Sequence, residues 1–276
     1  MTYRSIAPIL PLLLLATGCS DQTPVKNENA DQVAAAAVPG APPEGVADER
    51  AKNAPASNVR ETGKLIDFGY AYPREAAQIP ELAKFLDADR EAKREALVAA
   101  AERDKAASAK GDFPYHPHSH LQKWLRVTST PRFLSLSAEI ETYMGGAHGM
   151  TSFETLIWDR NRRRTLKPLD LFTSPEAFDA AIRDEFCARI RQAKAAKGIQ
   201  APDEPDSPFS KCPPASAQTV WLGSSDGRYL DRMTVAIGPY EIGPFAEGSY
   251  KINVPVTAAL VRVVKPEFAR DFLPVS

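Results

Sequence analysis

The stretch RFLSLSAEIETYMGGAHGMTSFETLIWD, residues 132–159, decides the fold class of this 276-residue chain. Apolar and polar residues alternate through residues 132–143 and again through residues 150–158, and a period of two is typical of β-strands with one buried face. The glycine-rich sequence YMGGAHG, residues 143–149, connects the two runs as a turn. Residues 121–129 alternate in the same way, so we expect them to form a hairpin with residues 132–143, followed by a third strand.

The segments on either side of this stretch predict two long helices and further strands. Residues 80–110 carry apolar residues at helical spacing, with an expected buried stripe of Leu82, Phe85, Leu86, Leu97 and Ala100. A second helix begins at Pro175, after a capping Thr173 or Ser174, and stops at Gly198. Shorter strands are expected at residues 65–72, 233–237 and 250–254, with a last helix from about residue 255. Strands and helices segregate along the chain, which predicts an α+β fold: an antiparallel β-sheet with helices packed on it.

The beginning of the chain has the pattern of an export signal. Its apolar run, residues 6–15, is too short to span a bilayer and follows a single positive charge, Arg4. The sequence Leu-Ala-Thr-Gly-Cys ending at Cys19 resembles the lipobox of bacterial lipoproteins, with an ordinary signal peptide as the alternative. This resemblance implies removal of residues 1–18, acylation of Cys19 (palmitate among the acyl groups) and a lipid-anchored protein that faces the periplasm. Ser20 after the cysteine implies sorting to the outer membrane.

Residues 19–60 are rich in Ala, Pro, Asn, Asp and Glu and nearly lack large apolar side chains. Such a segment cannot bury enough surface to offset its ordering entropy, so we predict a disordered tether between the lipid and the folded part. Residues 61–276 then form the folded domain, with possible halves at 61–160 and 161–276. Removing Arg4 with the signal peptide leaves 33 basic residues against 35 acidic ones, which gives no reason to expect nucleic acid as a partner.

Two cysteines, Cys187 and Cys212, remain after lipidation of Cys19. An even remainder in an oxidising compartment favours one disulfide over a metal or nucleophile pair.

Candidate chemistry is sparse. His116, His118 and His120 lie on one side of an extended segment, as zinc or copper ligands would, but Pro117 and the lack of a nearby carboxylate favour an incidental polar loop. The residues Gly223-Ser-Ser-Asp-Gly227 match the letters of G-x-S-x-G but have the composition of a turn and not of a nucleophile elbow, and no H-E-x-x-H motif occurs. The sequence implies no cofactor, and an envelope hydrolase or metal-dependent enzyme with an unrecognised active site remains the alternative to a non-catalytic protein.

Several ordered motifs resemble an exported bacterial domain family, the PdaC/RsiV-like family. They are YMGGAH at residues 143–148, a strand ending in Trp158-Asp159, LKPLDLF at 166–172, GPYEIGPFAEG at 238–248 and YKINVP at 250–255. Members include an accessory domain of a peptidoglycan deacetylase and the ectodomain of a lysozyme-binding anti-sigma factor. No deacetylase catalytic domain and no sigma-binding region is recognisable here. The resemblance therefore implies a cell-envelope recognition domain without catalysis, which binds a lysozyme-like protein or a peptidoglycan-related ligand.

The resembling motifs supply the candidate binding residues. Gly145 and Gly146 would permit positive φ or a close backbone approach at the turn. His148 would either hydrogen-bond across that turn or contact a ligand. The aromatic and acidic residues of the second loop would either cap the core or line a recognition surface. The candidates are Tyr143, Gly145, Gly146, His148, Tyr240, Glu241 and Phe245.

Overall fold

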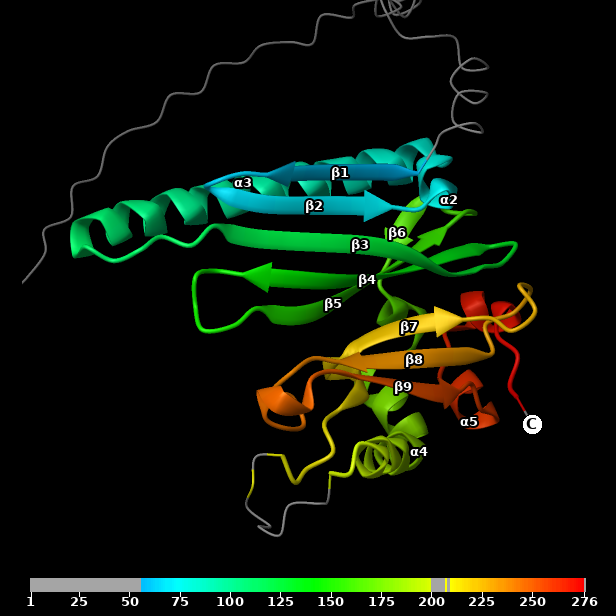
Figure 1. The fold of residues 1–276 in the computed structure, drawn as a ribbon. Helices are drawn as coiled ribbons and strands as arrows, with labels where there is room; N and C mark the ends of the chain where they lie inside the picture. The colour runs from blue at the N-terminus through cyan, green and yellow to red at the C-terminus, as the bar shows by residue number, and fades with distance from the viewer. Residues whose placement is uncertain (1–55, 200–206, 208, 276) are drawn as a thin grey trace, which may run out of the picture. The chain divides into compact units, whose positions relative to one another are not determined.

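The computed structural model describes residues 56–199, 207 and 209–275, all within one compact unit of the chain. The predictions for the signal peptide, for Cys19 and for most of the tether fall outside these residues. The described part is an α+β fold with two β-sheets (Figure 1).

The first sheet has six strands whose spatial order follows their order in the sequence. They are β1 (Ser57–Thr62), β2 (Ile66–Tyr72), β3 (His118–Ser129), β4 (Phe133–Tyr143), β5 (Met150–Asp159) and β6 (Arg164–Leu166). The predicted β3–β4–β5 meander is present, and four of the five strand pairs are antiparallel. The pair β2–β3 is parallel, which the sequence did not indicate. A parallel pair needs a long crossover, and the short helix α2 (Arg74–Ala77) and helix α3 (Pro80–Gly111) supply it.

Strand β1 corrects the predicted end of the tether. Residues 57–60 were assigned to the disordered segment, yet Ser57–Thr62 pairs along its whole length with β2. Only alternate residues of β1 are partly buried, because it lies at the edge of the sheet. An edge strand of polar composition has a weak local pattern, and pairing with its neighbour decides its conformation.

Helix α3 covers one face of the first sheet (Figure 1). Leu82, Leu86 and Leu97 are buried as predicted, whereas Phe85 is exposed and Ala101 takes the buried place expected for Ala100. The stripe is therefore rotated slightly from the predicted one. Polar contacts join the same surfaces: Asp89 accepts a hydrogen bond from Tyr70 at 2.7 Å, and Trp124 donates to the Tyr70 hydroxyl at 2.8 Å.

The second sheet has three antiparallel strands, β7 (Thr219–Gly223), β8 (Arg232–Ile237) and β9 (Tyr250–Pro255). Strand β7 was not predicted, because five residues after a proline-rich segment carry too short a pattern. Helix α4 (Pro175–Ala196) packs on β9, and the Ser174 hydroxyl caps it by accepting a hydrogen bond from Ala177 N at 3.1 Å. The last helix, α5 (Ala258–Val261), is short, and a 3-10 helix, Pro266–Asp271, follows it.

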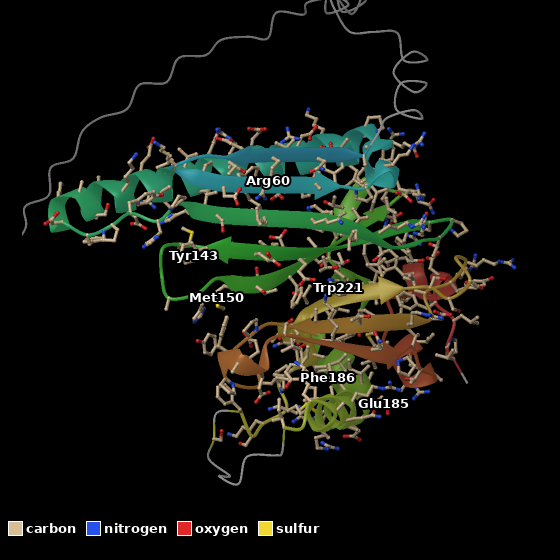
Figure 2. The ribbon with its side chains drawn as sticks, in the orientation of Figure 1. Arg60, Tyr143, Met150, Glu185, Phe186 and Trp221 are labelled. Atoms are coloured by element: carbon tan, nitrogen blue, oxygen red, sulfur yellow. A yellow bond between two sulfur atoms is a disulfide. The ribbon has the colours of Figure 1, made fainter. Side chains whose placement is uncertain are left out.

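The second sheet packs on the face of the first sheet that α3 leaves open. Glu154 on β5 faces α3, where it pairs with Lys93, so the neighbouring Phe153 faces the opposite side. There Phe153 meets Trp221 of β7 edge-on, and Trp221 Nε1 donates to the Glu154 carbonyl at 3.0 Å. Figure 2 shows Trp221 where β7 approaches β5.

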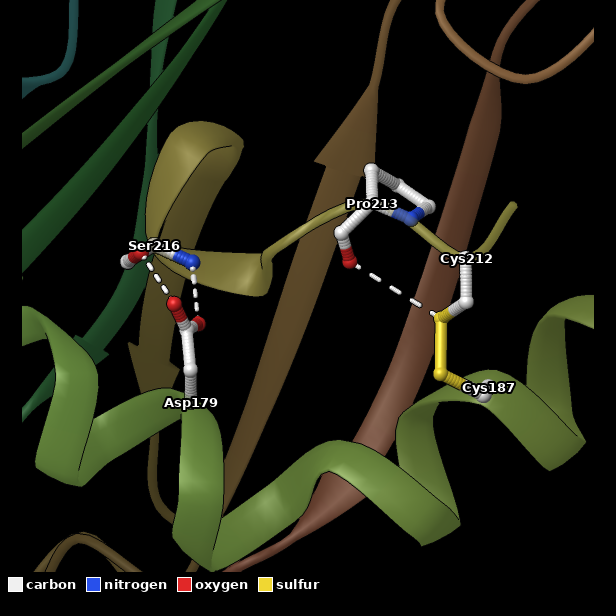
Figure 3. The surroundings of a disulfide bond; sticks show 5 residues. All are labelled: Asp179, Cys187, Cys212, Pro213 and Ser216. Atoms are coloured by element: carbon white, nitrogen blue, oxygen red, sulfur yellow. Dashed lines mark hydrogen bonds between the residues drawn. A yellow bond between two sulfur atoms is a disulfide. The ribbon is translucent and has the colours of Figure 1, made fainter. Parts of the chain in front are cut away.

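The predicted disulfide between Cys187 and Cys212 is present, with the two Cα atoms 5.7 Å apart. It attaches the segment that follows residue 207 to helix α4 (Figure 3). Beside it, the carboxylate of Asp179 on α4 accepts hydrogen bonds from the Ser216 backbone N–H, at 2.8 Å, and from the Ser216 hydroxyl. Cys212 and Ser216, which precede β7, are thus attached to α4 by a covalent bond and by a pair of hydrogen bonds to a carboxylate.

A buried ion-pair network around Arg132 joins the first sheet to the C-terminal segment. Arg132, in the β3–β4 turn, donates to the carboxylate of Asp159 at 3.1 Å and to that of Asp271 at 2.8 Å. Its guanidinium also donates to the Glu267 carbonyl at 2.7 Å and lies over the ring of Phe268. Asp159 is fully buried (0% exposed), so this network carries charge inside the protein.

Candidate functional site

Two loops meet at one end of the sheets: residues 144–149 between β4 and β5, and residues 238–249 between β8 and β9. Gly145 has φ 81°, as predicted for a turn glycine. Gly146 has neither a positive φ nor a close neighbour, so that part of the prediction is wrong. Gly149 is the position that needs glycine for space, because a Cβ atom there would lie 2.9 Å from the Thr142 carbonyl oxygen.

His148 links the two loops. Its ring stacks on the ring of Phe245 with the centroids 3.8 Å apart, and its Nε2 lies 3.4 Å from the Tyr240 hydroxyl. The other ring nitrogen, Nδ1, lies 2.9 Å from the Gly149 carbonyl oxygen. His148 therefore hydrogen-bonds within the turn as predicted, and it also contacts two of the candidate residues from the second loop.

Two lysines hold the second loop: Lys194 in helix α4 and Lys197 directly after it. Lys197 donates to the carbonyl oxygens of Glu247 and Ser249 at 2.7 and 3.0 Å. Lys194 donates to the Ile242 carbonyl and lies 3.4 Å from the Glu247 carboxylate, which also accepts a hydrogen bond from Tyr250. Burial, reinforced by that bond to Glu247, raises the pKa of Tyr250 and keeps its hydroxyl a donor. These contacts hold the loop in one conformation.

The second loop is closely packed at Gly243. A Cβ atom there would overlap the carboxylate of Glu247. Any other residue at position 243 would therefore displace this carboxylate from its present contacts with Lys194 and Tyr250.

Above this support the two loops expose apolar side chains. Tyr240 is 51% exposed, Met144 in the first loop 48%, and Met150 at the start of β5 39%; the ring of Tyr240 lies against the stacked pair of His148 and Phe245. We call these five residues the tip patch. Figure 2 shows Tyr143 at the last residue of β4 and Met150 at the first residue of β5. Of the other candidates, Tyr143 is half-buried and Glu241 is exposed.

Tyr240 has a backbone conformation that favours glycine. Its φ is 70°, in the left-handed region that bulky residues seldom occupy. A strained residue persists only where the surrounding structure holds it, and such residues concentrate at functional sites. Here the strain places an aromatic ring in solvent instead of in the core. Of the two alternatives for the second loop, the exposure of Tyr240 excludes that this ring caps the core.

The histidines of residues 116–120 do not converge. His116 is exposed, whereas His118 is buried with Nε2 3.2 Å from the Asp104 carboxylate. His120 lies under α3, stacked on Phe68, and burial lowers its pKa despite a hydrogen bond to Gln122. Within residues 56–199, 207 and 209–275, no group of three or more His, Cys, Asp or Glu side chains is arranged to hold a metal ion.

The sequence motifs contain the three rings of His148, Tyr240 and Phe245, but they do not predict the contacts that hold the second loop or the exposed methionines nearby in sequence. Met144 and Met150 have the sequence context of ordinary strand-end residues, and nothing in their spacing predicts their exposure. The anchoring by Lys194 and Lys197 depends on how α4 packs on β9. The spacing of Gly243 and Glu247 is the one local sequence feature related to this support. Its meaning is clear only in the folded loop, where the Glu247 carboxylate lies over Gly243.

Part of the chain is similar to a known protein family. Residues 59–151 match the family model described as "Deacetylase PdaC", from β1 to the start of β5. No curated protein matches the chain. PdaC-family domains are extracytoplasmic, and the disulfide is consistent with that location.

Solved structures with similarity include a DUF3298 family protein from Pseudomonas aeruginosa, 18% identical, covering 77% of this chain and 95% of that one with a TM-score of 0.49. A DUF3298 family member from Bacteroides fragilis is 17% identical, covering 72% and 88% with a TM-score of 0.44. None of the helices in the described ranges has the length and hydrophobicity needed to cross a bilayer.

Proposed function

We propose, from the premise that residues 59–151 match the PdaC model, that this protein is a non-catalytic recognition domain of the cell envelope. Its ligand is an envelope protein of the lysozyme-like kind, and the tip patch is the contact surface. The observation that carries the proposal is the contact of the two loops through the rings of His148, Phe245 and the exposed Tyr240, with Met144 and Met150 exposed at the two ends of the first loop.

The composition of the patch suits a protein partner. Aromatic residues and methionine are enriched at protein interfaces, and rigid aromatic anchors lose little entropy on binding. Lys194 of α4 and Lys197, directly after its last residue, contact the second loop in the absence of a partner, so binding does not have to create these contacts. The strained backbone at Tyr240 is then explained by the exposure of its ring.

The binding test uses the chain without residues 1–18 and with Cys19→Ser, immobilised and exposed to purified c-type lysozyme and to proteins of an envelope extract. Tyr240→Asn removes the ring while asparagine tolerates the left-handed backbone. We expect Tyr240→Asn and Met150→Ala each to weaken partner binding about tenfold or more, as central interface residues do.

The matched control is Leu125→Ala, because Leu125 is also 50% exposed but lies on β3 away from the patch. Its binding should equal that of the unmodified chain. Equal binding by all three variants would reject the patch as the contact surface. Retention by purified peptidoglycan with no protein partner would reject the protein ligand in favour of a glycan.

We further propose that Cys19, which lies outside the described residues, anchors the domain through lipid to the outer membrane. Cys19→Ala should move the protein from the outer-membrane fraction to the soluble periplasmic fraction of cells. An unchanged distribution between fractions would argue against lipidation.

A further inference from the structure

A cavity of about 590 Å³ opens between the second half of α4 and the segment around Cys212. Its apolar wall consists of Ile190, Ile199, Phe209, Ile242 and the disulfide. This volume lies within the range of sites for small organic ligands, which are mostly apolar with a few placed polar groups. The cavity is separate from the tip patch, although Ile242 belongs to the loop that carries it.

The charged groups of the cavity are all positive. Arg191, Lys194 and Lys211 line it, and no carboxylate does among the described residues. Lys194 is engaged with the second loop through Ile242 and Glu247. For Arg191 and Lys211 the described part of the chain shows neither a hydrogen bond nor an ion pair. The side chains of Arg191 and Lys211 can therefore pair with an anionic group of a ligand in the apolar cavity.

We propose that this cavity binds an amphiphile with one anionic head group and a single alkyl chain. The head group would accept charge-assisted hydrogen bonds from Arg191 and Lys211, which are stronger than bonds between neutral groups. The alkyl chain would lie against Ile190, Phe209 and Ile242, where removal of apolar surface from water favours binding. The apolar wall and the all-positive charged groups together select this chemistry over a neutral or cationic lipid.

The test is isothermal titration of the oxidised chain, without residues 1–18 and with Cys19→Ser, using dodecanoate below its micellar concentration. We expect one dodecanoate per protein and about fourfold weaker binding for each methylene removed from the chain. Dodecyl phosphate, the second anionic probe, distinguishes a phosphate head from a carboxylate head, since either can occur in an envelope lipid. Dodecyltrimethylammonium has the same chain with the opposite charge and should not bind.

Two variants assign binding to the cavity. Arg191→Gln with Lys211→Gln should weaken dodecanoate binding tenfold or more, whereas Arg183→Gln, an exposed position on the same helix outside the cavity, should leave it unchanged. Ala195→Trp, which fills the cavity from α4, should abolish binding while circular dichroism shows the fold retained.

Three outcomes would overturn the proposal. They are the absence of saturable dodecanoate binding, equal binding of the cationic amphiphile, and dodecanoate binding that the double variant leaves unaffected. Because the titration does not involve the tip patch, its result is independent of the proposed protein recognition.

Discussion

Replacing Arg132 with methionine is expected to lower the free energy of unfolding by about 3–5 kcal/mol, the range measured when one partner of a buried ion pair is removed. Arg132 contacts Asp159, which is fully buried, and Asp271, which is partly buried. Methionine would keep the packing against Phe268 but leave two carboxylates without their shared cation. Asp159 would keep the backbone N–H donors of Asn161 and Arg162 at 3.0 and 3.3 Å and the more distant Arg162 guanidinium at 3.9 Å.

Chemical denaturation at neutral pH measures this effect. Arg60→Met is the control, because Arg60 pairs with Asp67 at 2.8 Å but its side chain is 52% exposed. An exposed pair contributes about 0–1 kcal/mol, so this variant should unfold close to the unmodified protein. Adding Asp159→Asn to Arg132→Met should recover part of the loss, since it removes one unpaired charge. A loss below about 1 kcal/mol for Arg132→Met would show that water or rearrangement compensates the carboxylates.

Removing the disulfide should be the second large effect. Cys187 and Cys212 are separated by 25 residues, and the chain-entropy model gives a loss of about 3–4 kcal/mol for a closed loop of that size. The double variant Cys187→Ala/Cys212→Ala should therefore have a lower midpoint of urea unfolding. The midpoint of the unmodified chain should fall by a similar amount when a reducing agent is present.

Two comparisons separate this entropic effect from lost contacts. The reducing agent should not change the unfolding of the double alanine variant. Asp179→Asn weakens the neighbouring bonds to Ser216 without opening the loop, and it should cost less than loss of the disulfide. If reduction left the midpoint unchanged, the hydrogen bonds of Asp179 would be enough to hold the α4–β7 connection.

Local periodicity predicted the parts of the fold that form from consecutive residues. The β3–β4–β5 meander and the helices α3 and α4 appear close to their expected ends. Strands β1 and β7 are short, and their conformation depends on neighbours distant in sequence. The parallel pairing of Ile66 with His118 is likewise a property of the crossover, which no local pattern encodes.

The same distinction applies to the candidate site. The motifs pointed to His148, Tyr240 and Phe245, and the structure brings these three rings together. The histidine run 116–120 also had suggestive spacing, but its members have three different surroundings. His118 contacts Asp104 and His120 contacts Gln122. These contacts depend on how the strand packs against its neighbours, which the local pattern does not reveal.

The stacking of His148 on Phe245 makes the tip patch a non-local structure. His148 and Tyr240 are 92 residues apart in sequence. His148 lies in a loop of the first sheet and Tyr240 in a loop of the second. During synthesis the first loop can fold with its hairpin, but the patch is complete only after the second sheet has formed. A partner that recognises the whole patch thus distinguishes finished molecules from folding intermediates, and its binding reports the maturity of the domain.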